Sequence, residues 1–249
     1  MAQVTEFQHK NNPTRNDTHE NWHVSTWAHR AWFATGCAAV LFSLAKSLHS
    51  LRASTNPRPW LESILAAVAA YVLSDLGTGI YHWAIDNYGA AGTPVFGPQI
   101  EAFQGHHEQP WAITKRHLAN NLYQTAATVA AFVFPVSLFS GDPAVLAFVG
   151  VFAGLVIFSQ QFHAWAHTPR GKLPPVVAAL QDAGILLAQP QHAAHHRPPY
   201  NNNYCIVSGL WNGFLDRSGF FLGLEMVLDR VAGYRPRSWT QSLVTCLDV

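Results

Sequence analysis

The sequence predicts an all-α integral membrane protein, a four-helix bundle with one further helix lying along the membrane surface. Hydrophobic residues make up 49% of the 249-residue chain and charged residues only 12%, about half the roughly 25% of soluble domains. Four stretches are also long and apolar enough to cross a ~30 Å hydrocarbon layer. The formal charge of +1 argues against a nucleic-acid binder. A soluble bundle of unusually apolar helices is the alternative, because the mean hydropathy is only +0.06.

The four expected spans cover residues 27–49, 60–82, 121–139 and 144–162. Between the last two, Gly141, Asp142 and Pro143 predict a tight turn, so these spans should form an antiparallel hairpin. The apolar stretch 176–188 has 13 residues and is too short to cross. Prolines flank it, and we expect an interfacial helix there.

Four spans place the N-terminal segment, the loop 81–120 and everything after residue 162 on one face. Of the 15 Lys and Arg residues, three lie toward the other face (Lys46, Arg52 and Arg58), which leaves 12 on the first. The positive-inside bias makes the richer face cytosolic or stromal. We expect residues 1–25 to be a polar, flexible segment without a secretory signal, residues 26–240 to form the membrane domain, and residues 241–249 to be a tail.

Histidine is unusually frequent, with 14 residues, and eight of these fall in four short motifs on the same expected face. The motifs are HxxxD, HH, HxxxH and HxxHH. In order they contain His82 with Asp86, His106 with His107, His163 with His167, and His192 with His195 and His196. Helical residues three and four apart share one face. The order and common side of the motifs therefore indicate a shared site, whereas a single histidine would be an ordinary interfacial residue.

This residue set favours a two-metal centre. Imidazole suits Fe, Zn, Cu and Ni, and eight histidines are too many for one zinc but enough for two metals. The three cysteines lie outside the motifs, which argues against structural zinc and iron–sulfur sites. A histidine-rich di-iron centre can activate O2 and remove hydrogen from an unactivated C–H bond, which no side-chain base can do. An apolar substrate would reach such a centre from the bilayer.

Around these motifs the sequence resembles the Kua-type lipid desaturase family, which includes the plasmanylethanolamine desaturases. The segments that carry the resemblance are DLGTGIYHWAIDNYG, QIEAFQGHHEQPWAIT, FSQQFHAWAH, LQDAGILLAQPQHAAHH and PYNNNYCIVSGLWNGFLD. Two further segments, STWAHRAW and GYRPRSW, resemble the plant plastid branch, the phosphatidylglycerol palmitate Δ3-trans desaturases. The resemblance covers residues 25–239.

The resemblance implies a membrane di-iron desaturase that uses O2 as co-substrate and two electrons, with ferredoxin as donor. All eight motif histidines would be iron ligands, and Asp86 would be either a ninth ligand or a carboxylate that fixes a histidine tautomer. No other catalytic side chain is implied. The substrate would be the palmitoyl chain of phosphatidylglycerol, given a trans double bond at carbon 3. The location would be the chloroplast thylakoid or envelope, with the site facing the stroma, and the endoplasmic reticulum is the alternative.

Other functions share parts of this pattern. A plasmanylethanolamine-type desaturase or a lipid hydroxylase would use the same ligands. A histidine-rich metal transporter is disfavoured, because the histidines lie at the helix ends and carboxylates are sparse within the spans.

Several other residues have two interpretations each. Lys115, Arg116 and Arg197 are lipid-headgroup ligands or ordinary positive-inside charges, Glu101 is an acceptor for a ligand histidine or a solvated acid, and Asn201–Asn203 orient ligands or form a turn.

Overall fold

The computed structural model describes residues 22–240, and every regular element in that range is helical. The rest of the expected N-terminal segment, residues 1–21, and the expected tail, residues 241–249, lie outside the described residues. The all-α expectation is therefore confirmed for the part of the chain that the structure describes.

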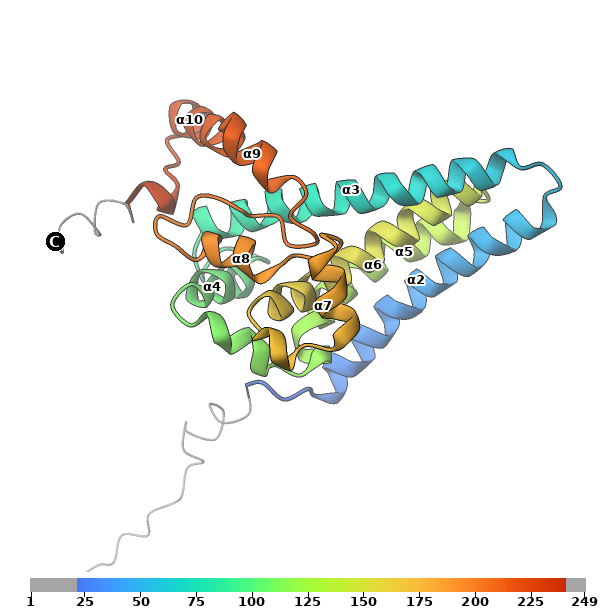
Figure 1. The fold of residues 1–249 in the computed structure, drawn as a ribbon, viewed down its shortest axis with the longest axis horizontal. Helices are drawn as coiled ribbons and strands as arrows, with labels where there is room; N and C mark the ends of the chain where they lie inside the picture. Colours follow the sequence, from blue (N-terminus) through green and yellow to red (C-terminus); the bar gives the residue numbers. More distant parts are fainter. Residues whose placement is uncertain (1–21, 241–249) are drawn as a thin grey trace, which may run out of the picture.

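Four long helices form a bundle, with their connecting turns at one narrow end (Figure 1). They are α2 (Trp27–Ala53), α3 (Arg58–Asn87), α5 (Leu118–Phe139) and α6 (Pro143–Ala166). Each is long and apolar enough to cross a membrane, which confirms the four expected spans. The short helices all gather at the opposite end, which we call the site end.

Small side chains bring the long helices close together. A Cβ atom added to Gly36 of α2 would lie 2.7 Å from the Cβ of Ala126 in α5, and one added to Gly150 of α6 would lie 2.6 Å from Leu44. Hydroxyl groups supplement this packing, since the Ser43 Oγ donates to the Leu146 carbonyl at 2.9 Å. Close packing of small residues and interhelical hydrogen bonds is how helices associate in lipid, where burial of apolar surface gives no driving force.

Helix α3 is longer than the expected span and continues beyond it at the site end. Its 30 residues correspond to about 45 Å of helix, more than the ~30 Å thickness of the hydrocarbon layer. His82, the last residue of the expected span, and Asp86 in the extension lie four residues apart on one helical face. The surplus length therefore allows the first histidine motif to lie outside the hydrocarbon layer.

Short helical segments build the site end and cover the ends of the bundle (Figure 1). In chain order they are α4 (Gly97–His106), η1 (Pro110–Lys115), η2 (Arg170–Lys172), α7 (Pro175–Asp182), α8 (Gln189–His195), α9 (Asn212–Ser218) and α10 (Phe220–Ala232).

The expected interfacial helix at 176–188 is wrong in its second half, because α7 ends at Asp182. Gly184 has a φ of +68°, a left-handed conformation that glycine adopts without steric cost. The chain then turns back, and the buried Gln181 side chain donates to the Leu187 carbonyl at 2.9 Å. Leu187 is itself fully buried. The apolar run therefore divides into a short helix and a buried loop.

Candidate metal centre

All four histidine motifs meet at the site end, although they come from α3, α4, α6 and α8. Their ligand atoms form two groups, and within each group these atoms all lie within 4.8 Å of one another. The histidine cluster consists of His106, His163, His167, His192 and His196. The carboxylate cluster consists of His82, Asp86, His107 and His195. Every residue that the sequence singled out as a metal ligand is thus in one of the two clusters.

The local structure explains how each motif reaches the site. The HxxxH pair occupies the last turn of α6 and its C-cap, so both rings point the same way. The HxxHH motif lies at the end of a helix, since α8 ends at His195 and His196 is its C-cap. His106 and His107 are the last residue and the C-cap of α4, and one ring goes to each cluster. The two adjacent histidines therefore link the clusters.

In the histidine cluster, ring nitrogens face one another at contact distance. The Nε2 atom of His167 lies 2.9 Å from that of His106 and 2.8 Å from that of His192. The His192 Nε2 also lies 3.1 Å from the His196 Nε2. Each neutral imidazole nitrogen offers one N–H or one lone pair, so the shared nitrogens cannot satisfy all these contacts as hydrogen bonds. A single cation among the lone pairs would satisfy them together.

The carboxylate cluster shows the same mismatch more sharply. His82 donates from Nδ1 to the Tyr204 carbonyl at 2.9 Å, and His195 donates from Nδ1 to the Asn202 carbonyl at 2.7 Å. A carbonyl only accepts, so both rings carry a proton on Nδ1, and in the neutral tautomer that binds a metal the Nε2 would carry a lone pair. Both lone pairs face the Asp86 Oδ2, at 3.2 and 3.3 Å.

The remaining ring of this cluster, that of His107, also contacts the Asp86 carboxylate. The His107 Nε2 is 3.3 Å from the same Asp86 oxygen, and neither carboxylate oxygen of Asp86 has a hydrogen-bond partner among the described residues. A buried carboxylate facing lone pairs is strongly unfavourable unless a cation lies between them. The residues present therefore fit a bound metal ion in each cluster.

Burial keeps several of these imidazoles in the neutral form that binds metal. Desolvation, with repulsion from neighbouring histidines, lowers the pKa of His167 to about 4 and that of His106 to about 2. Desolvation also lowers the pKa of His195 to about 4, against the opposing effect of Asp86. These rings are unprotonated at neutral pH, and no proton has to leave them before a metal binds.

The carbonyl groups that orient His82 and His195 belong to a segment that the sequence only partly indicated. Asn202 lies in the NNN run, but its backbone carbonyl rather than its side-chain amide contacts the histidine. Tyr204 is buried, and its ring lies 5.2 Å from that of His195. Backbone acceptors have no side-chain signature, so no residue pattern could have identified these contacts.

Asp75 fixes this segment to α3 and gives it a defined position beside the clusters. Its Oδ1 accepts backbone N–H groups from Val207, Ser208 and Gly209 at 3.1, 2.7 and 3.0 Å. Its Oδ2 accepts from the Trp211 N–H at 3.2 Å. The side chain is fully buried, and charge-assisted hydrogen bonds of this kind are about twice as strong as neutral ones. Asp75, near the end of the second span, is thus a structural anchor that attaches residues 207–211 to α3.

The two clusters adjoin one another. The rings of His82 and His163 lie 5.6 Å apart between centroids, and those of His107 and His196 lie 5.1 Å apart. A cavity of about 320 Å³ borders the histidine cluster, and its lining includes His106, His163 and Arg116. Glu101 also lines this cavity but is exposed. The site is therefore a pair of neighbouring clusters, each of which could hold a metal ion, with an opening on one side.

Comparison with known proteins agrees with this geometry. Residues 71–239 match the model of the lipid desaturase domain. The chain belongs to the lipid desaturase family. It is thereby an oxidoreductase of the fatty acid desaturase class. The matched region contains all nine residues of the two clusters.

Several relatives are named as desaturases. Fatty acid desaturase 4, chloroplastic, of Arabidopsis thaliana is 55% identical over 87% of this chain and 66% of its own length. Fatty acid desaturase 4-like 2, chloroplastic, of the same plant is 49% identical over 97% of this chain and 84% of its own. Plasmanylethanolamine desaturase 1 of Mus musculus is 30% identical over 72% of this chain and 71% of its own length. No solved structure shows a significant match to the chain.

Proposed function

We propose that the chain is an O2-dependent di-iron acyl-lipid desaturase, in which the eight clustered histidines and Asp86 hold two iron ions. The observation that carries the proposal is the convergence of nine ligand atoms into two groups. Buried ring or carboxylate atoms of His82, Asp86 and His163 in these groups have no hydrogen-bond partner among the described residues. Imidazole with one carboxylate is a ligand set suited to iron. Asp86 faces three ring nitrogens, which favours a ligand role over that of an outer hydrogen-bond partner.

Bound iron would supply the activation of O2 that breaking an unactivated C–H bond requires. In the overall reaction, a –CH2–CH2– unit, O2, two electrons and two protons give –CH=CH– and two waters. The protein's own residues have other tasks. They keep the imidazoles neutral by burial, and they fix the tautomers of His82 and His195 through the Tyr204 and Asn202 carbonyls. They also enclose the reacting centre within the site end.

A metal transporter fits this structure less well. Transport through a bundle needs ionisable groups along a path between the helices. In the described spans, the buried Asp75 carboxylate is occupied by four backbone N–H groups and is not free to bind a passing ion. Asp86 lies with the other ligands at the site end.

For the substrate we propose the palmitoyl chain of phosphatidylglycerol, with a trans double bond introduced at carbon 3. The support is the similarity to relatives named fatty acid desaturase 4, chloroplastic, and the polar cavity beside the histidine cluster. Carbon 3 is only two bonds from the ester carbonyl carbon, so the polar end of the lipid must lie close to the metals. A partly polar cavity suits that requirement better than a long apolar tunnel would.

We propose ferredoxin as the electron donor and the stromal side of a chloroplast membrane, thylakoid or envelope, as the location of the site. The relatives named chloroplastic support the compartment. A separate, small cavity lies beside the carboxylate cluster, and its lining includes Asp86, His107 and Arg237. Arg237 is exposed, so an acidic donor protein could approach this cluster by charge complementarity.

Lipid analysis tests the proposal most directly. The full chain is expressed in a host that contains palmitoyl-phosphatidylglycerol and a reduced ferredoxin, and acyl chains are analysed for double-bond position and geometry. A Δ3-trans chain on phosphatidylglycerol is expected, together with about two irons per purified chain. Vinyl-ether phosphatidylethanolamine would instead indicate a plasmanylethanolamine-type activity. Zinc alone, at one ion per chain, would contradict the di-iron assignment.

A further inference from the structure

The cavity beside the histidine cluster has a lining that is about half polar, and most of its polar side chains are uncharged. Its wall combines helices α4, α5 and α6 with η1, and His106 and His163 close its inner side. Amide and hydroxyl groups line much of the remainder. They belong to Gln99, Gln109, Asn121, Gln124, Thr125 and Gln160. Its volume of about 320 Å³ falls within the range of small-ligand sites, too small for a whole phospholipid but large enough for one end of it.

The single cation in this lining is Arg116, in the link between η1 and α5. Its side chain is half-buried. The residue also lines a second hollow of about 360 Å³ that shares Trp22, Ala102 and Gln124 with the first. Arg116 therefore lies where the two hollows meet, so a molecule entering the inner cavity from the outer one would pass it.

The guanidinium of Arg116 is held in place, yet it lacks an anionic partner. It lies 5.6 Å from the centre of the Trp22 ring, a cation–π arrangement. Trp22 is fixed in turn, because the buried Asn120 side chain donates to the Trp22 carbonyl at 2.8 Å. Within residues 22–240, no carboxylate lies within 4.0 Å of this guanidinium.

A half-buried cation without a counter-ion indicates a ligand. Burial lowers the pKa of Arg116, but a guanidinium stays charged in proteins. The desolvation cost is therefore not relieved by loss of the proton, and an anion is the natural partner. Among anions, phosphate accepts the two-pronged hydrogen bonds of a guanidinium especially well. The uncharged amides around it could bind hydroxyl and ester oxygens.

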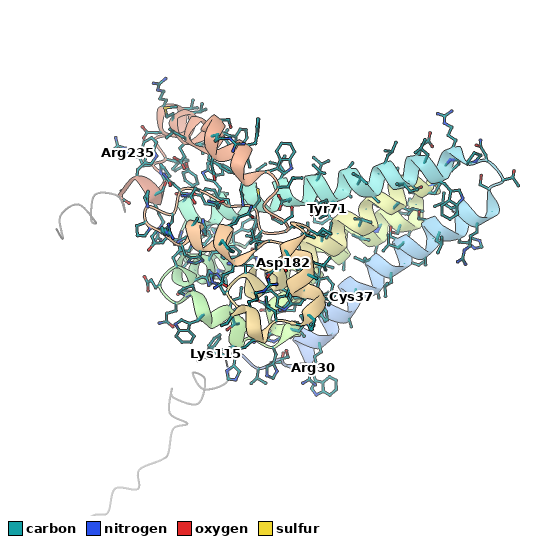
Figure 2. The ribbon with its side chains drawn as sticks, in the orientation of Figure 1. Arg30, Cys37, Tyr71, Lys115, Asp182 and Arg235 are labelled. Carbon is teal, nitrogen blue, oxygen red and sulfur yellow. The ribbon has the colours of Figure 1, made fainter. Side chains whose placement is uncertain are left out.

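We propose that this cavity binds the glycerophosphate end of an anionic phospholipid and that Arg116 binds the phosphodiester. The inference rests on the proposed function, because it places the first acyl carbons beside His106 and His163. It assigns the headgroup role to one of the three cations that the sequence offered. Lys115 and Arg197 do not line the cavity, and Lys115 lies at the outer edge of the site end (Figure 2), over the Trp111 ring at 4.3 Å.

Binding of labelled lipid to the purified, iron-loaded full chain tests the proposal, with Lys115→Ala as the matched control. Arg116→Ala and Lys115→Ala remove one positive charge from adjacent positions, but only the first changes the cavity. We expect Arg116→Ala to weaken binding of palmitoyl-phosphatidylglycerol about tenfold or more, and Lys115→Ala to change it less than about twofold. Arg116→Lys should fall between them, because it keeps the charge but loses the two-pronged geometry.

Two ligand controls identify what Arg116 recognises. Binding of an uncharged galactolipid with the same acyl chains should be the same in the wild type and in Arg116→Ala, since it has no phosphate. Inorganic phosphate should bind far more weakly than the lipid. If phosphate alone bound as tightly as the lipid, with the same dependence on Arg116, the ligand would not be a lipid and the proposal would be overturned.

Other outcomes are equally decisive. An equal loss of phosphatidylglycerol binding in Arg116→Ala and Lys115→Ala would show that Arg116 acts only as one of several surface charges. This result would overturn the proposal. So would unchanged binding in Arg116→Ala. Arg116→Gln, which is closer in shape, provides the same comparison if the alanine variant does not fold, and the unfolding temperature without lipid shows whether each variant is intact.

The steady-state kinetics should follow the binding. In Arg116→Ala the KM for phosphatidylglycerol should rise by a similar factor, while the iron content stays at the wild-type level. The proposed function and this inference fail in different ways. If the wild type made no double bond but bound the lipid through Arg116, only the proposed reaction would be wrong. If desaturation proceeded while Arg116→Ala bound the lipid normally, only the present inference would be wrong.

Discussion

The two clusters contain similar numbers of residues, yet they differ in charge and in the hydrogen bonds that hold their rings in place. The histidine cluster has only neutral imidazoles, and both nitrogens of His163 lack hydrogen-bond partners among the described residues. The carboxylate cluster contains Asp86, and two of its rings are fixed by backbone carbonyls. The first borders the large cavity and the second a small one beside Arg237.

If each cluster holds a metal ion, as proposed, this difference indicates a division of roles between the two metals. A carboxylate stabilises a higher positive charge on its metal, whereas an all-imidazole set leaves the metal charge uncompensated. The outer hydrogen bonds also make the carboxylate cluster the more rigid of the two. We therefore expect the clusters to respond differently to the same kind of change.

The largest effects should come from removing one ligand from each cluster. His163→Ala and His195→Ala should both abolish product, because each leaves a metal position incomplete. Each variant should retain about one iron, measured by elemental analysis of the purified protein. His49→Ala, an exposed histidine near the narrow end, should keep two irons and full activity. Full activity in both cluster variants would refute the ligand assignment.

Asp86→Asn tests the charge of the carboxylate cluster while nearly keeping its shape. Activity should fall by at least roughly 10- to 100-fold, the loss that follows removal of even an outer partner of a metal ligand. Iron loss should be confined to one site. If this variant kept two tightly bound irons and normal turnover, Asp86 would be neither a ligand nor an essential outer partner, and the distinction between the clusters would lose its basis.

Asp75→Asn should weaken the support of the carboxylate cluster without touching a ligand. The amide keeps one oxygen but places an NH2 group against a backbone N–H, which should lower the free energy of unfolding by about 2–3 kcal/mol. Thermal unfolding measures this loss. Asp142→Asn is the matched control, because Asp142 caps α6 through its Oδ1 and asparagine caps helices equally well. A similar change in both variants would contradict the anchoring role.

Low pH should destabilise the metal-free protein. The pKa of His167 and His195 is about 4 in the folded chain, against an ordinary value of 6.5. Between these values the unfolded chain binds more protons, so the stability rises with pH. Their contribution is fully present above about pH 6.5 and is lost as the pH falls toward 4. Unfolding temperatures of metal-free protein measured from pH 8 to pH 5 check this, and a flat profile would contradict it.

The smallest effect should follow from Arg237→Ala beside the small cavity. If an acidic donor approaches there, the KM for reduced ferredoxin should rise by about two- to fivefold, with a weaker dependence on salt concentration, as for other charges at the rim of an interface. The KM for the lipid should not change. Arg58→Ala, an exposed arginine at the far end of α3, serves as control. An equal effect in both variants would remove the case for donor docking at this cavity.

The sequence by itself determined the four long helices and singled out the candidate ligand residues. Hydrophobic stretches of membrane-spanning length are local properties, and so is the three- and four-residue spacing that places His163 with His167 and His192 with His196 on shared faces. The prediction of a surface helix over 176–188 is wrong in its second half because it, too, rests only on local sequence properties. The composition of this stretch suits either a surface helix or a buried loop, and only the packing around Gln181 and Leu187 decides between them.

Only the tertiary structure decided which histidine joins which cluster. His106 and His107 are adjacent in the chain, yet they belong to different clusters, because the C-terminal turn of α4 directs their rings to opposite sides. The backbone carbonyls of Asn202 and Tyr204, the Asp75 anchor and the isolation of Arg116 in its cavity were likewise decided there. These features are contacts between segments far apart in the sequence, and the type of a side chain does not tell which distant residues it will contact.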